Sequence, residues 1–182
     1  LFNRVVKTAE GAARGTETEM DFEVMHGNYP LMPNKTLSIV IDEELHQLGG
    51  ISYNDEENKF AREIYQTLLN PDRPIGDQEN IQPLELSQTK GSTDVGDVSW
   101  KVPTSGVRIA TWVPGTSSHS WQAVAAGGTT IGTKGSTLAA KVLANSALRF
   151  YQDPKLIEAA WEEHKINIGD HQYEALLGDR KP

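Results

Sequence analysis

The sequence predicts an α/β protein, in which helices are combined with short strands around a core. Apolar residues recur at three- and four-residue steps over several long segments, as they do in amphipathic helices. Two shorter runs, 19–24 and 107–113, have the alternation or the β-branched content of strands. With 37% hydrophobic and 23% charged residues, the composition is close to that of ordinary globular domains, so a buried core is expected.

For the first half of the chain, the sequence predicts a helix, a strand and two further helices. A helix from the start to about Gly15 precedes the strand at 19–24, in which Met20, Phe22 and Val24 alternate with acidic residues. After the prolines at 30 and 33, Asn34 can cap a helix that ends at Gly49 and Gly50. Another helix is predicted over about 54–69, and 70–90 has the composition of a long loop.

The second half begins with a glycine-flanked turn and ends in two helices. The turn at 91–100 precedes the strand-like run 107–113, and a turn containing His119 follows at 114–121. A stretch of small residues continues to Gly135 and leads into a helix over about 136–151. Asp153 and Pro154 begin the last predicted helix, because proline is well placed in a first turn.

Charge and composition exclude several classes of function. The net charge of −8, from 25 acidic against 17 basic residues, argues against a nucleic-acid surface, which needs clustered Lys and Arg. No run of 18 apolar residues occurs, so we expect no membrane span. Without cysteine there is no thiolate metal site, and any zinc-type site must use His and carboxylates. The absence of cysteine is also compatible with the cytoplasm, where we expect the protein to act.

The residues that could carry chemistry are few. His119 lies in a turn after a predicted strand, where an imidazole can project into a cleft. The turn formed by Gly91, Ser92, Thr93 and Asp94 can offer backbone N–H groups and two hydroxyls to an anionic substrate group, while its carboxylate orients a neighbouring ligand. No HxH or HExxH spacing accompanies His119, so from spacing alone a structural or merely exposed histidine is the more common explanation.

The order of four short motifs resembles the C-terminal part of M20-type metallopeptidases and amidohydrolases. The motifs are GSTD at 91–94, VPT at 102–104, HSWQ at 119–122 and an IGTKG turn at 131–135. The resemblance implies a three-layer mixed-sheet catalytic domain with two divalent metal ions, interrupted by an α+β lid that forms the dimer surface. Residues 1–31 would then be the last helix and strand of the lid, and 32–182 the C-terminal part of the catalytic domain.

The resemblance also implies roles for individual residues. His119 matches the final metal ligand of the family, and Asp94 matches the aspartate that stands beside the site. Gly91, Ser92 and Thr93 match positions that line the substrate cleft. Thr133 departs from the pattern, since related proteins often have His there, and this puts a substrate contact in doubt.

The expected function of the parent protein is therefore metal-dependent hydrolysis of an amide between an acyl group, such as p-aminobenzoyl, and an amino acid, such as glutamate. Zinc or manganese would polarise the carbonyl and lower the pKa of a bridging water. The substrate would be a small acyl-amino acid or short peptide, and the protein a homodimer through the lid. The chain starts directly in a helix without Met, so we expect a fragment. The resemblance implies that the other metal ligands precede it, so the fragment alone should be inactive and bind zinc or manganese weakly, if at all.

Two other classes of function remain open at this point. A non-catalytic interaction or regulatory module would account for the missing ligands. An unrelated anion-binding α/β domain would use the turn at 91–94 to hold a phosphate or a carboxylate.

Overall fold

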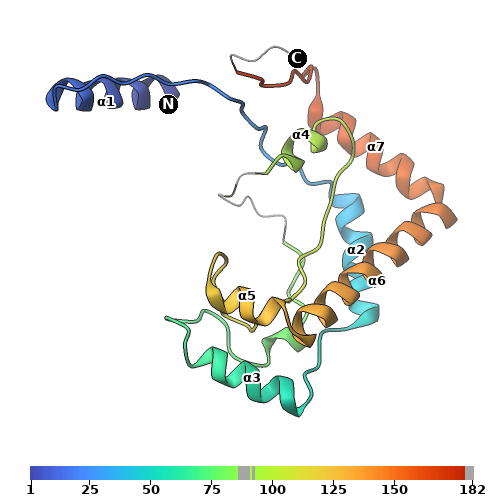
Figure 1. The fold of residues 1–182 in the computed structure, drawn as a ribbon. Helices are drawn as coiled ribbons and strands as arrows, with labels where there is room; N and C mark the ends of the chain where they lie inside the picture. The colour runs from blue at the N-terminus through green and yellow to red at the C-terminus, as the bar shows by residue number, and fades with distance from the viewer. Residues whose placement is uncertain (86–90, 92, 179–182) are drawn as a thin grey trace.

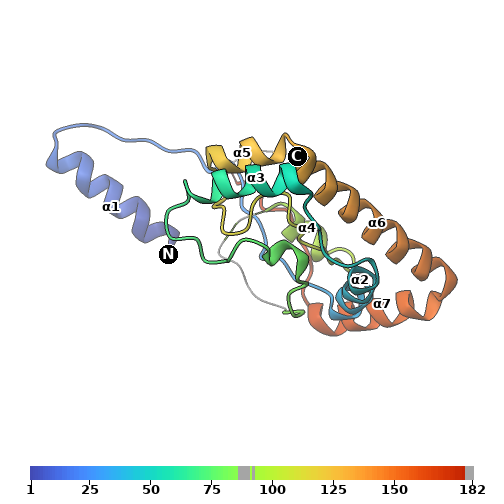
Figure 2. The same cartoon turned by 90° about the horizontal axis from the view of Figure 1, so that it is seen from below.

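A computed structural model describes residues 1–85, 91 and 93–178. Its helices are seen in two orthogonal views in Figures 1 and 2. In chain order they are α1 (Phe2–Gly15), α2 (Lys35–Leu48), α3 (Asp55–Tyr65), the 3₁₀ turn η1 (Asp77–Glu79), α4 (Val95–Ser99), α5 (Trp121–Gly127), α6 (Thr130–Gln152) and α7 (Pro154–Ile168). None of these helices combines the length and the apolar character needed to cross a bilayer.

The prediction of an α/β fold is wrong for this structure, which is helical and has no β-strand over 1–85 and 93–178. The two expected strands, 19–24 and 107–113, are not β-strands in the described chain. A strand requires a neighbour for its backbone hydrogen bonds, whereas the alternation of side chains is a property of the segment alone. The mixed sheet expected from the family resemblance is therefore also absent from the described residues.

Helix α1 stands apart from the other helices. Both views show it at the end of an extended segment, away from the helical body (Figures 1 and 2). None of its residues is buried, and Val5 is 59% exposed. Its ring contact is local, because Phe2 packs edge-on against Phe22 in the segment that follows. The predicted helix is confirmed, but its apolar face is not covered by the rest of the described chain.

Helix α2 is held at its start by a buried cap. The side chain of Asn34 accepts a hydrogen bond from Leu37 N, and its Nδ2 donates to Ala160 O of α7 at 2.9 Å. At the other end Gly49 adopts φ 82°, a left-handed conformation that favours glycine. The bounds expected from the sequence are confirmed. The same asparagine joins α2 to α7, and α2 also packs along α6.

The main core lies where α3 meets the segments around α5 and the start of α6. Helix α3 begins with a capping box, in which Asn54 and Glu57 each accept from the other's backbone N–H. The buried members of this core are Ile51, Tyr53, Ala61, Ile64, Val113, Ala126 and Ile131. Val113 precedes the turn that contains His119 and Ala126 follows it, so this core holds the chain on both sides of that turn.

Helix α6 begins earlier than the sequence indicated, at Thr130 rather than near residue 136. The hydroxyl of Thr129 accepts from Ile131 N and starts the helix. Two buried glycines allow close approach of backbone, since a Cβ on Gly132 would meet Gly127 O and one on Gly135 would meet Ala110 O. The IGTKG segment is therefore helical, and its glycines serve packing. Helix α7 begins at Pro154 as predicted.

Candidate functional site

His119 lies in the turn that leads into α5. Ser120 caps this helix by accepting from Ala123 N at 3.2 Å, and its hydroxyl donates to Ser117 O at 2.7 Å. These bonds close the turn and place His119 at φ 58°, in the left-handed region that few non-glycine residues adopt. The imidazole is exposed, and no described group forms a hydrogen bond or ion pair with it. Its ring nitrogens are free to bind a ligand.

This imidazole lines a shallow hollow of about 440 Å³. No acidic or basic side chain lines it apart from the histidine itself. The lining residues are Trp112, His119, Ser120, Trp121, Ala123 and Val124. The hollow is thus a mainly apolar and aromatic surface, and its ionisable side chain is the imidazole of His119.

The described residues do not by themselves fit a metal ion. Nowhere in the described ranges do three His, Asp or Glu side chains gather closely enough to hold one. A catalytic zinc takes about three protein ligands, and here His119 offers one. Three of the other histidines have other contacts: His164 lies at 3.0 Å from Ser99 O, His46 lies beside Asp42, and His171 packs edge-on against Trp100.

The predicted substrate turn is exposed and precedes α4. Gly91, Thr93 and Asp94 are all exposed, whereas Ser92 lies outside the described residues. Thr93 Oγ1 accepts from Val95 N at 3.3 Å, and the Asp94 carboxylate makes no capping bond. Helices α4 and α5 lie well apart in Figure 1. The structure therefore does not bring this turn next to the turn that carries His119.

The aspartate that contacts other segments is Asp97 of α4. Its carboxylate accepts from Tyr29 N at 3.3 Å and from the hydroxyl of Tyr173 at 3.0 Å. The hydrogen bond to Asp97 raises the pKa of Tyr173. The rings of Tyr29, Trp100, His171 and Tyr173 pack together beside it. Asp97 thus fastens the extended segment before α2 and the tail after α7 to α4.

An ion pair with a buried carboxylate, which sequence patterns did not indicate, joins α3 to α6. Lys134 of α6 donates to the buried carboxylate of Glu57 and, at 2.9 Å, to Ser52 O. Burial raises the pKa of Glu57, but hydrogen bonds, foremost from Lys134, lower it on balance to about 2. Burial also raises the pKa of the nearby Tyr53 to about 12. Glu57 is therefore charged at neutral pH and connects α3 to α6.

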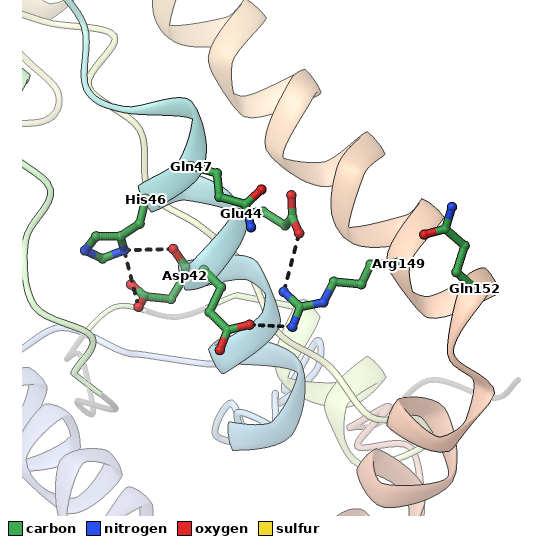
Figure 3. A pocket seen from close by; sticks show the side chains of 7 residues that line it. Asp42, Glu44, His46, Gln47, Arg149 and Gln152 are labelled. Carbon is green, nitrogen blue, oxygen red and sulfur yellow. Dashed lines mark hydrogen bonds and ion pairs between the residues drawn. The ribbon is translucent and has the colours of Figure 1, made fainter.

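A second hollow, about 730 Å³, lies between α2 and α6 and is shown in Figure 3. Arg149 forms ion pairs with Glu43 and Glu44, and His46 contacts Asp42 (Figure 3). The cation Arg149 is thus already paired with carboxylates of α2. These ion pairs have the character of contacts that hold two helices together, so this hollow is not the candidate site.

Comparison with known proteins relates the chain to part of a hydrolase. The chain is similar to one of the subunits of p-aminobenzoyl-glutamate hydrolase from Escherichia coli (strain K12), with 32% identity over 190 residues. The alignment covers 91% of this chain and 40% of that protein, so the chain spans less than half of its relative's length. No family model and no solved structure matches the chain. The M20 assignment therefore stays a prediction from the motifs.

Proposed function

We propose that this chain is part of a hydrolase that cleaves the amide between an acyl group and an amino acid, with p-aminobenzoyl-glutamate as its model substrate. The observation that carries the proposal is the similarity, over 91% of the chain, to a subunit of a hydrolase named for that substrate. The free imidazole of His119 beside an aromatic hollow supports it.

The proposed role of His119 is to bind one of two divalent metal ions, zinc or manganese, in the longer protein. Its exposure and its lack of other partners support this role, because a ligand nitrogen must be neutral and accessible. The remaining ligands would come from outside this chain, which would be inactive alone. In the same proposal Asp94 orients a ligand, and Gly91, Ser92 and Thr93 contact the substrate in a homodimeric enzyme.

The test of this proposal is His119→Ala in the complete protein that contains the chain. Release of p-aminobenzoate and glutamate from p-aminobenzoyl-glutamate should fall below detection, while the unfolding midpoint should stay unchanged because the side chain is exposed. His26→Ala is the matched control, since His26 is also an exposed histidine in an extended segment, and it should retain activity. Full activity of the His119 variant, or no hydrolysis by the unaltered complete protein, would refute the proposal.

A second candidate is a non-catalytic interaction module, and helix α1 is the observation that favours it. Its apolar residues are exposed, and such surfaces are typical of protein contacts. The two candidates differ in their response to substrate: an interaction module would remain inactive as a complete protein and would bind a partner through α1. The third class, an anion-binding α/β domain, is not supported, because the structure is helical.

A further inference from the structure

Two tryptophans stand on either side of His119 in the chain and share its hollow. Trp112 lies before the turn and Trp121 begins α5 directly after it. Trp121 is 60% exposed, and Val124, one helical turn later, is 78% exposed. Large apolar side chains gathered at one exposed place are uncommon unless that surface contacts something.

The two indoles are held differently. Trp112 packs partly against the main core, and its backbone carbonyl lies 3.5 Å from the hydroxyl of Tyr53. Trp121 is at the first position of a helix that Ser120 caps, so its backbone is fixed while its ring remains exposed. The hollow therefore has one wall built into the core and one aromatic face that is open to a ligand.

The chemistry of the lining selects a neutral aromatic ring. No Lys, Arg, Asp or Glu lines the hollow, so it offers little to a charged group apart from His119. Indole faces favour offset-stacked or edge-to-face contact with another ring, in addition to the benefit of burying apolar area. An aliphatic acyl group would gain the free energy of burying apolar area but not the ring–ring contact.

We propose that the Trp112–Trp121 hollow binds the aromatic ring of the acyl group and makes Trp121 a specificity-determining residue for aryl over alkyl acyl-amino acids. This inference rests on the proposed function, since it assigns one half of the substrate to the surface beside His119. The ring lies against the indole of Trp121, and the amide that carries the amino acid lies toward the imidazole.

Binding to this chain can be followed through the indole N–H signals of its four tryptophans in ¹H–¹⁵N NMR spectra. The signals of Trp112 and Trp121 should shift on addition of p-aminobenzoyl-glutamate and much less with N-acetylglutamate. Trp121→Ala should weaken binding roughly tenfold, the size expected for loss of a ring contact together with its buried area. Trp161→Ala is the matched control, because Trp161 is a partly exposed tryptophan on α7, and it should leave the binding unchanged.

The inference would be overturned if neither indole signal shifted, if N-acetylglutamate bound equally well, or if the Trp161 variant lost as much affinity as the Trp121 variant. In the complete protein, Trp121→Ala should raise KM for p-aminobenzoyl-glutamate roughly tenfold with little change in kcat. If the complete protein hydrolyses neither substrate, the proposed function fails, and the NMR titration still decides whether the hollow binds aromatic rings.

Discussion

Lys134 and Glu57 are 77 positions apart in the chain, and a hydrogen-bonded ion pair joins their side chains early in α6 and α3. Glu57 also caps its own helix by accepting from Asn54 N at 2.8 Å. The carboxylate is buried, whereas the Lys134 side chain is 39% exposed. This pair therefore stabilises the core that supports the His119 turn, and it does so without a direct part in the candidate site.

Replacing the charge at this position should destabilise the protein. Glu57→Gln keeps an amide oxygen for the cap and removes the negative charge from Lys134. We expect a loss of about 2 kcal/mol in the free energy of unfolding, less than for a fully buried pair because the ammonium is partly solvated. Urea unfolding measures this, with Glu56→Gln, an exposed neighbour in the same turn, as the control. Equal effects of both substitutions would show that the pair does not contribute.

The same pair predicts how stability depends on pH. The pKa of Glu57 is lowered from 4.5 to about 2 in the folded state, so its contribution is fully present above about pH 4.5. As the pH falls from 4.5 toward 2, the unfolded chain takes up a proton that the folded chain excludes, and stability declines. Glu57→Gln should reduce this decline. Unfolding curves at several pH values check it, and an unchanged slope in the variant would contradict the assignment.

The buried cap of α2 should also contribute strongly to stability. Asn34 is 2% exposed and serves both Leu37 N and Ala160 O. Asn34→Ala removes both bonds, and we expect a loss of about 2 kcal/mol by thermal or urea unfolding. Asn34→Asp keeps an acceptor for the cap but loses the donor to α7, so its stability should lie between those of the unaltered protein and the alanine variant. A variant with aspartate as unstable as that with alanine would show that the bond to α7 dominates.

The contact between Tyr173 and Asp97 should hold the chain after α7 in place. Tyr173→Phe removes the 3.0 Å hydrogen bond and leaves the ring contact with Tyr29 available. The amide of Gly27, which donates to Leu176 O, should then exchange its hydrogen roughly threefold or more faster, because that bond depends on the tail. Hydrogen exchange measures this, with Tyr151→Phe as an exposed control. Unchanged exchange at Gly27 would mean that the ring contacts alone hold the tail.

Asp94 and Asp97 should respond differently to substitution in the complete protein. Asp94→Asn should lower activity by roughly 10- to 100-fold without a change in stability, if its exposed carboxylate orients a ligand. Asp97→Asn should act mainly on the packing of the tail, because its oxygens accept from Tyr29 N and Tyr173. Steady-state kinetics and thermal unfolding separate the two effects. Complete loss of activity in the Asp94 variant would indicate direct contact with the reacting groups.

The sequence by itself determined the features of this protein that depend on neighbouring residues. Asn34, Asn54 and Pro154 begin their helices where the local pattern indicated, because a cap bonds to backbone two or three positions away. The small and hydroxyl residues around His119 likewise predicted the turn that the structure has there.

Only the tertiary structure decided the features that depend on distant residues. The runs 19–24 and 107–113 have strand-like patterns, yet neither forms a β-strand in the described chain, because a strand also needs a partner placed by the tertiary fold. The partners of Glu57 and Asp97 lie 77 and 76 positions away, at separations where no local pattern identifies a partner. The hollow beside His119 likewise requires Trp112 and Trp121 to meet across a turn whose ends the core holds together. Local hydrogen bonding is encoded in short stretches of sequence, whereas side-chain pairing follows from how the helices pack.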